Sequence, residues 1–195
     1  PPRSTPLYSS AASDVYKRQT LLHSQSVNGD AWEGATVNFW DDIIDTTGNN
    51  SDNSYFMIWR DLNGGSLNWP LDIVINLNKM VQITRFTVWQ RAYWYNGPSD
   101  TPYYFQEENM KSFTIYASND SQTWQELGQF DIGDPRDSEG NIPASALESA
   151  ANGHDFELES VSETFRYMKF SVTSNYGSET YVNGSEITLY GLDNL

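Results

Sequence analysis

The fold is decided by the stretch ITRFTVWQRAYWYNG, residues 83–97, in which a strand pattern runs directly into an aromatic loop. Phe86 and Val88 alternate with less apolar residues at the strand period of two, and β-branched and aromatic residues favour strands. A Gly-Pro step at residues 97–98 marks a turn. We therefore expect a buried strand that ends in an exposed loop.

The loop combines hydrogen-bonding groups with aromatic rings: Arg91, Tyr93, Trp94, Tyr95 and Asn96. Three consecutive rings in a loop cannot all face one core, so at least one is expected to meet solvent. A flat ring can cover the C–H face of a sugar while a guanidinium and an amide bind its hydroxyls. The alternative is that the rings cap the end of a β-sandwich and Arg91 pairs with a carboxylate.

Outward from this stretch, other segments repeat the period of two and are separated by turn residues: 71–77, 111–119, 124–132, 165–174 and 187–189. Their inward-facing residues are predicted to be Leu71, Ile73, Ile75, Leu77, Phe113, Ile115, Ala117, Met168, Phe170, Val172, Ile187 and Leu189.

A turn at residues 119–122 predicts a hairpin between two of these strands. Residues 133–153 are polar and irregular, with one helical turn expected at residues 144–150. Short strands at this spacing, with almost no helix-period pattern, indicate an all-β fold. We predict an antiparallel β-sandwich of the jelly-roll type.

The first 19 residues, PPRSTPLYSSAASDVYKRQ, share no pattern with the rest. Their last six residues resemble one reading frame of a transposase sequencing adapter. We therefore expect residues 1–19 to be an adapter-derived segment outside the fold, and residues 20–195 to form a single domain. On this expectation the native N-terminus is missing, and the lack of a signal peptide says nothing about location.

The chain is strongly acidic, with 26 Asp and Glu residues against 11 Lys and Arg residues and a net charge of −15. Without residues 1–19 the net charge is −17. Nucleic-acid binding depends on clustered cations, so this balance argues against a nucleic-acid or anionic-membrane partner. No apolar run reaches the roughly 18 residues of a membrane helix. The absence of Cys excludes disulfides, thiolate metal sites and Cys nucleophiles.

Five segments carry a family resemblance, in this order: WPLDIVINL, ITRFTVWQR, KSFTIYASNDSQTWQEL, FRYMKFSVTSNYG and SEITLYG. The chain resembles the discoidin, or coagulation-factor type C, superfamily of galactose-binding-like jelly rolls over residues 37–191. The polar insertion after the fourth predicted strand is similar to that in C-terminal domains of surface proteins from bacterial polysaccharide-utilisation systems. The resemblance implies a non-catalytic carbohydrate-binding module of a bacterial surface or secreted protein, with the other domains of a larger surface protein as candidate partners.

The resemblance also implies a binding site for glycan or polysaccharide at one end of the sandwich. An Arg and an Asn five residues apart match Arg91 and Asn96, and an aromatic residue before the last strand matches Tyr176. A family His and Trp pair falls on residues 55–59, where Trp59 matches the Trp. The His is replaced by Phe56 or Met57. Trp59 is alternatively a core residue.

A structural Ca2+ ion is the cofactor that the resemblance implies. Its ligands would come from Asp41, Asp42, Ser54 and Glu186. An oxygen-rich cage suits this hard cation. In this chain the family's Asp-Gly step is an Asp-Asp pair, Ser54 replaces a Thr, and the polar loop TTGNNSDNS, residues 46–54, lies between them.

Two other classes of function stay open. Glu107 and Glu108 form an acidic pair near the predicted site, as a glycoside hydrolase would need, although the alternative is a solvated loop. No nucleophile elbow, HExxH motif or glycine-rich phosphate loop is present. Exposed aromatic rings also suit protein adhesion. We predict that the chain is not an enzyme and that it binds glycan.

Overall fold

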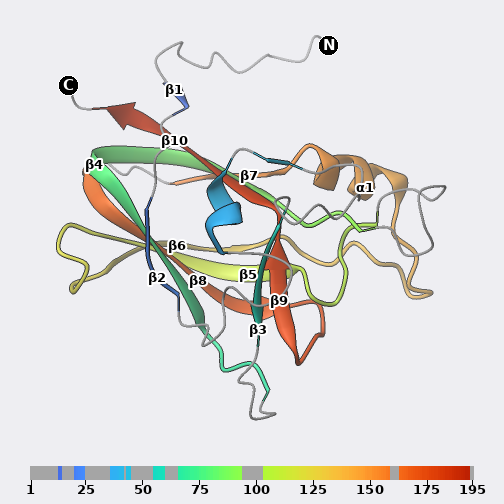
Figure 1. The fold of residues 1–195 in the computed structure, drawn as a ribbon. Helices are drawn as coiled ribbons and strands as arrows, with labels where there is room; N and C mark the ends of the chain where they lie inside the picture. Colours follow the sequence, from blue (N-terminus) through green and yellow to red (C-terminus); the bar gives the residue numbers. More distant parts are fainter. Residues whose placement is uncertain are drawn as a thin grey trace, which may run out of the picture.

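The computed structural model describes residues 13–14, 20–24, 36–41, 43–44, 55–59, 66–93, 103–158 and 163–193 (Figure 1). Its elements are β1 (Ser13–Asp14), β2 (Thr20–Ser24), the 3-10 helix η1 (Thr36–Trp40), β3 (Phe56–Trp59), β4 (Leu71–Trp89), β5 (Met110–Ser118), β6 (Gln125–Asp131), α1 (Ala144–Ala151), β7 (His154–Glu157), β8 (Phe165–Asn175), β9 (Tyr181–Gly184) and β10 (Glu186–Asp193).

The long strand β4 joins the two layers of the fold (Figure 1). Its first part pairs with β2 and β8, whereas its last part pairs with β7 and β10. Between the two parts the register shifts, and Asn78 adopts a φ of 59°, which Asn tolerates better than most residues. Two separate strands were predicted here, and the structure has one strand that turns from one layer into the other.

The described strands form one antiparallel sheet in the order β1-β10-β4-β8-β5-β6, in which β2 and β7 also pair with β4. A separate two-stranded sheet pairs β3 with β9. The sheet folds over a common core, so the architecture is the all-β sandwich that the sequence predicts. The hairpin predicted around residues 119–122 is confirmed as β5 and β6.

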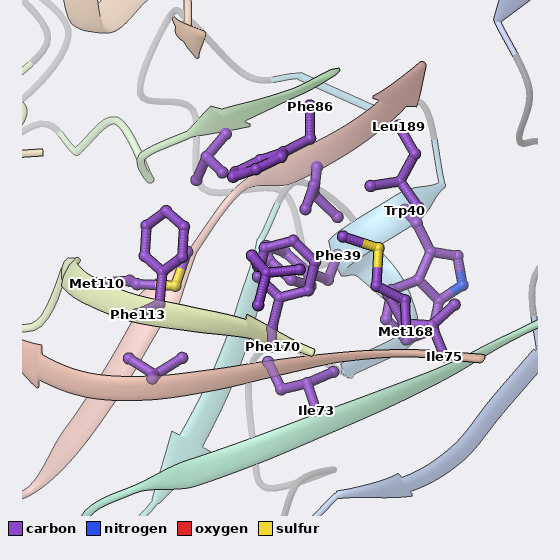
Figure 2. Packing of buried hydrophobic residues seen from close by; sticks show 14 of the residues in the cluster. Phe39, Trp40, Ile73, Ile75, Phe86, Met110, Phe113, Met168, Phe170 and Leu189 are labelled. Atoms are coloured by element: carbon purple, nitrogen blue, oxygen red, sulfur yellow. The ribbon is translucent and has the colours of Figure 1, made fainter. Parts of the chain in front are cut away.

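The core is centred on a phenylalanine cluster between the layers (Figure 2). Phe86 of β4 lies 6.0 Å from Phe113 and 5.7 Å from Phe170, measured between ring centroids, and meets both edge to face. The 3-10 helix η1 adds Phe39, whose ring lies 5.5 Å from that of Phe170. Each buried ring contributes on the order of 1.5–3 kcal/mol. All the residues predicted to face inward are buried.

Helix α1 forms because residues 144–151 are mostly Ala, Leu and Glu, which have high helix propensity. The helix ends where Gly153 adopts a φ of 82°, and the Gly153 amide donates to the Ala150 carbonyl at 3.1 Å. Ala150 is fully buried and anchors the helix. The single helical turn predicted at residues 144–150 is thus a helix of two turns.

One end of the sandwich, which we call the loop end, is defined by the end of β4 at Trp89, the start of β5 at Met110, the end of β8 at Asn175 and the start of β10 at Glu186. Strand register places these positions together, because Met110 pairs with Asn175 and Glu186 pairs with Trp89. The aromatic stretch that follows β4 therefore leaves the sandwich at the loop end.

Two residues of the N-terminal segment, Ser13 and Asp14, form β1 and pair with Gly191 and Tyr190 of β10. The other residues of the segment lie outside the described part of the chain. The expectation that residues 1–19 add nothing to the fold stays a prediction. If it is correct, the loss of this short pairing has no effect on stability.

Candidate functional site

The aromatic loop is closed at its base by a bridge between Tyr93 and Tyr103. The Tyr93 amide donates to the Tyr103 carbonyl at 3.2 Å, and the Tyr103 amide donates back at 3.0 Å. Tyr103 is 38% exposed and Tyr93 is half-buried. Residues 94–102, among them the predicted ligand residues Trp94, Tyr95 and Asn96, lie outside the described residues. The bridge fixes where this loop begins and ends on the sandwich.

Arg91 is held beneath that bridge. Its guanidinium carbon lies 3.6 Å from the centroid of the Tyr55 ring and 5.2 Å from that of Tyr93. Its backbone amide donates to Asn109 Oδ1 at 2.9 Å, and its carbonyl accepts from Asn109 Nδ2 at 3.2 Å. The Arg91 guanidinium was predicted to bind sugar hydroxyls, which needs an exposed group, but Arg91 is only 7% exposed. The planar cation packs on a buried ring from the segment before β3, which the local sequence does not reveal.

Tyr176 lies at the loop end, as predicted, but its hydroxyl binds protein groups. The hydroxyl donates to the Gly133 carbonyl at 2.6 Å and accepts from Gln90 Nε2 at 3.1 Å. Burial raises the pKa of Tyr176 above its ordinary value. Tyr176 therefore ties the end of β8 to the segment after β6. Gln90 and Arg91 are adjacent in the chain, yet Gln90 reaches Tyr176 and Arg91 reaches Tyr55.

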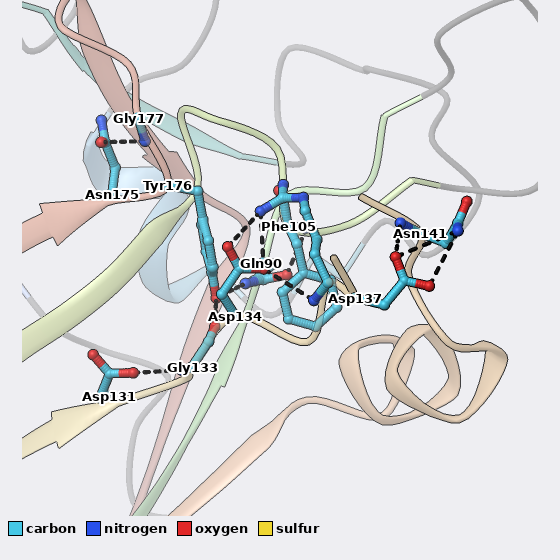
Figure 3. Close-up of polar contacts among 11 residues, drawn as sticks. Gln90, Phe105, Asp131, Gly133, Asp134, Asp137, Asn141, Asn175, Tyr176 and Gly177 are labelled. Carbon is cyan, nitrogen blue, oxygen red and sulfur yellow. Dashed lines mark hydrogen bonds and ion pairs between the residues drawn. The ribbon is translucent and has the colours of Figure 1, made fainter. Parts of the chain in front are cut away.

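A network that the sequence did not predict surrounds Tyr176 (Figure 3). Phe105 adopts a φ of 61°, and its amide donates to Gln90 Oε1 at 3.0 Å. Arg136 donates from Nη2 to the Phe105 carbonyl and from Nη1 to both carboxylate oxygens of Asp134, at 3.0 and 2.9 Å. The sequence signal for this network is the Asp-Pro-Arg triplet at residues 134–136, within a stretch that is predicted to be irregular.

Beside the network lies a pocket of about 230 Å³. Its walls come from Phe105, the segment after β6, helix α1 and the first residue of β7. The polar lining residues are Asp134, Ser149 and His154. Burial lowers the pKa of His154 to about 4, so its imidazole is neutral at pH 7. Among the described residues, His154 Nε2 has no hydrogen-bond partner.

The remaining predicted ligand residues lie on or near β3. Phe56 and Met57, which stand where the family has a His, are both buried in the core, so this position offers no hydroxyl-binding group. Trp59 is the last residue of β3 and pairs with Tyr181, but the structure describes only its backbone. Of the acidic pair, Glu108 accepts a hydrogen bond from the Tyr181 hydroxyl at 3.2 Å, and Glu107 is exposed.

Two of the four predicted calcium ligands are brought together. The Asp41 amide donates to Glu186 Oε2 at 3.0 Å, across 145 residues of sequence, and Glu186 is 2% exposed. A buried carboxylate beside a second acidic residue suits a hard cation. Asp42 and Ser54 lie outside the described residues, and the described part of the chain holds no group of three or more His, Cys, Asp or Glu that could bind a metal. Calcium therefore stays a prediction.

No described helix is long and apolar enough to cross a membrane.

The family model of DUF5000, a domain of unknown function, matches residues 40–191. The chain belongs to this family. No curated protein matches the sequence. The matched range runs from the end of η1 into β10 and includes the loop end, whereas β1 and β2 precede it.

Solved structures share the fold of this DUF5000 domain. A SusE-like protein, BT2857, has a TM-score of 0.71 at 14% identity, with 89% of this chain and 96% of that chain covered. The carbohydrate-binding module CBM32-3 of a family 31 glycoside hydrolase from Clostridium perfringens has a TM-score of 0.60 at 16% identity, with 93% and 95% covered. A putative chitobiase fragment from Bacteroides thetaiotaomicron has a TM-score of 0.61 at 14% identity, with 98% of each chain covered. The predicted discoidin-like, galactose-binding-like sandwich is thereby confirmed.

Proposed function

We propose that the chain is a non-catalytic carbohydrate-binding module of a bacterial surface or secreted protein, and that it binds glycan with the loop between Tyr93 and Tyr103. The observation that carries this proposal is the bridge at the base of the loop. It presents exposed Tyr103 next to a segment that contains Trp94, Tyr95 and Asn96. Aromatic faces beside an amide are suited to the C–H and O–H groups of a sugar ring.

In this proposal Arg91 positions the loop, since its guanidinium lies under Tyr93 and its backbone is held by Asn109. Tyr176 has a similar positioning role through Gln90. The names of similar structures support the function at a coarser level, because one is a carbohydrate-binding module and another is a SusE-like protein. The SusE-like neighbour also supports the surface location.

Glu107 and Glu108 do not suggest a hydrolase. The Glu108 carboxylate already accepts the Tyr181 hydroxyl, and Glu107 is an exposed residue whose carbonyl accepts the amides of Tyr176 and Ser178. We therefore propose binding without turnover.

A glycan array on residues 20–195 tests this function. Binding should be lost in Trp94→Ala and weakened in Tyr103→Ala. The matched control is Trp124→Ala, because Trp124 is a half-buried aromatic residue just before β6, at the opposite end of the sandwich. Array binding that survives both loop substitutions would place the site elsewhere. Capture of a protein with no glycan bound would favour adhesion.

A further inference from the structure

We propose that the pocket between Phe105 and helix α1 is a second subsite, which takes one neutral sugar residue. The inference rests on the proposed glycan-binding function, but it concerns residues that are separate from the Tyr93 to Tyr103 loop tip.

The size of the pocket limits its ligand to a single ring. Its volume of about 230 Å³ is below the roughly 300–1,000 Å³ of pockets that hold drug-sized ligands. Its walls are preformed, because Phe105 is fixed by hydrogen bonds from its amide to Gln90 and to its carbonyl from Arg136. The opposite wall is helix α1, anchored by the buried Ala150.

The Asp134 carboxylate supplies the acceptor that sugar hydroxyls need. A carboxylate has about four lone-pair sites, two on each oxygen. The Arg136 amide and Nη1 use Oδ1, at 3.2 and 3.0 Å, and Nη1 also reaches Oδ2 at 2.9 Å. Oδ2 therefore keeps a site for a ligand hydroxyl, while Arg136 holds the carboxylate in one orientation (Figure 3).

Ser149 supplies the complementary hydroxyl from helix α1. It lines the same pocket, and its hydroxyl makes no hydrogen bond to any residue that the structure describes. A serine hydroxyl can both donate and accept. Besides Asp134 and Ser149, the lining consists of His154, Gly133 and the apolar side chains of Phe105, Ile132, Pro135 and Ala146. An apolar wall with two hydroxyl-binding groups fits the two kinds of surface on a pyranose ring.

The charge of the pocket selects a neutral sugar over an acidic one. Asp134 is a lining residue, whereas the Arg136 guanidinium is already engaged by Asp134 and by the Phe105 carbonyl. None of the described lining residues is a lysine or arginine, and His154 is neutral at pH 7 because burial lowers its pKa. A uronate would meet the Asp134 carboxylate and the field of a chain with a net charge of −15.

NMR of the two histidine side chains gives a direct test, since His154 lines the pocket and His23 lies in β2. The probes are the methyl glycosides of galactose and glucose, N-acetylglucosamine, and glucuronic acid as the charged counterpart. We expect at least one neutral sugar to shift the His154 imidazole signal at millimolar concentration, with no shift at His23 and none from glucuronate. Such weak affinity is expected for one ring.

Matched substitutions on helix α1 show whether the sugar lies in the pocket. Ser149→Leu should reduce the shift at least tenfold, because the new side chain fills the pocket mouth from an exposed position. Ser145→Leu makes the same change four residues earlier, at an exposed residue outside the lining, and should leave the shift intact. Asp134→Asn should weaken binding of the neutral sugar, and unchanged histidine signals without ligand would show that each variant is folded.

The possible results separate this inference from the proposed function. If His154 is silent with every neutral sugar while the array shows binding that Trp94→Ala removes, the second subsite is wrong and the loop site stands. If His154 responds and array binding survives Trp94→Ala, the subsite stands and the loop site is wrong. A response to glucuronate equal to that of the neutral sugars, or one that persists in Ser149→Leu, overturns the subsite.

Discussion

At the scale of single residues, two arginines of β4 and the segment after it show how burial changes what a guanidinium does. Arg91 stacks on Tyr55 with 3.6 Å between guanidinium carbon and ring centroid, and Arg85 stacks on Tyr190 at 3.8 Å. Arg91 is 7% exposed, whereas the Arg85 side chain is 25% exposed and also pairs with Asp155. Cation–π energies rise from about 0.5–1 kcal/mol at exposed sites to about 2 kcal/mol when the pair is desolvated.

We therefore expect Arg91→Ala to destabilise the fold by about 1–3 kcal/mol, through the lost stacking and the space it leaves over Tyr55. Arg85→Ala is the matched control and should cost less than about 1 kcal/mol. Chemical unfolding of both variants measures the difference. Equal losses of stability in the two variants would show that the burial of Arg91 adds nothing to stability. An Arg91→Ala variant as stable as wild type would favour the prediction that the guanidinium binds ligand.

His154 predicts a pH dependence of stability. Its folded-state pKa is about 4, below the ordinary value of 6.5, because burial disfavours the charged ring. The unfolded chain therefore takes up this proton first as the pH falls, and stability is lost between about pH 6.5 and 4. Asp120, whose pKa is lowered to about 2 by backbone amides of Thr123 and Gln122, loses its contribution only below about pH 3.8. The two windows do not overlap.

The measurement compares denaturant unfolding at pH 7 and pH 5. Wild-type protein should lose more stability between these values than His154→Gln, which keeps a polar side chain that does not titrate. The same loss in both proteins would assign the pH dependence to other groups.

These residues mark the limit of what the local sequence predicts. That Arg91 and Tyr176 share the loop end was predictable from two strand ends together with the family resemblance, which implies that both ends lie on the same side of the sandwich. Their surroundings were not, because Tyr55 comes from a segment 36 residues before Arg91 and Gly133 from one 43 residues before Tyr176. The backbone conformation of Phe105 is harder still to predict, since nothing in the surrounding sequence signals a left-handed residue there.

At the scale of elements, alternating strands were predictable because one face of each is buried. The hairpin β5–β6 was also predictable, since a polar turn separates two such strands. The continuity of β4 was not, because Asn78 and Lys79 are typical of a turn between strands. In the structure they lie at a bend within one strand. The sequence also did not predict that the insertion at residues 133–153 contacts β4.

Gly153 makes that contact and offers a test of it. A Cβ atom at Gly153 would lie 2.6 Å from Thr87 Cγ2 and 2.6 Å from Trp89 Cε2, and its φ is 82°. Gly140 has a similar φ of 87°, but a Cβ atom there would have nothing within 4 Å. Both alanine variants carry the backbone cost of about 1 kcal/mol, and only Gly153→Ala adds a steric clash.

Gly153→Ala should therefore unfold at a lower denaturant concentration than Gly140→Ala, by about 1–3 kcal/mol in the free energy of unfolding. Equal effects would mean that α1 and β7 can move away from β4 without cost. In that case the pocket wall formed by α1 would not be rigid.

At the scale of the whole molecule, the N-terminal segment makes only a two-residue pairing between β1 and β10 in the described structure. Deleting residues 1–19 should change the melting temperature by less than about 2 °C, since a shift of about 2–4 °C per kcal/mol is usual for this size. The comparison needs the full chain and residues 20–195 under the same conditions. A fall of several degrees would mean that the segment belongs to the fold.

The predicted calcium site would join two segments from opposite ends of the domain sequence. Asp41 follows η1 and Glu186 begins β10, and the backbone amide of Asp41 donates to Glu186 Oε2 at 3.0 Å. An ion held there with Asp42 and Ser54 would bind the folded state alone and stabilise it by about 2.7 kcal/mol at a hundred times its dissociation constant. We expect a chelator to lower the melting temperature, excess calcium to restore it, and Glu186→Gln to remove the response. Glu157→Gln, at an exposed position on β7, should respond as wild type does. Identical melting with chelator and with calcium would show that the two acidic residues are held together by protein contacts alone.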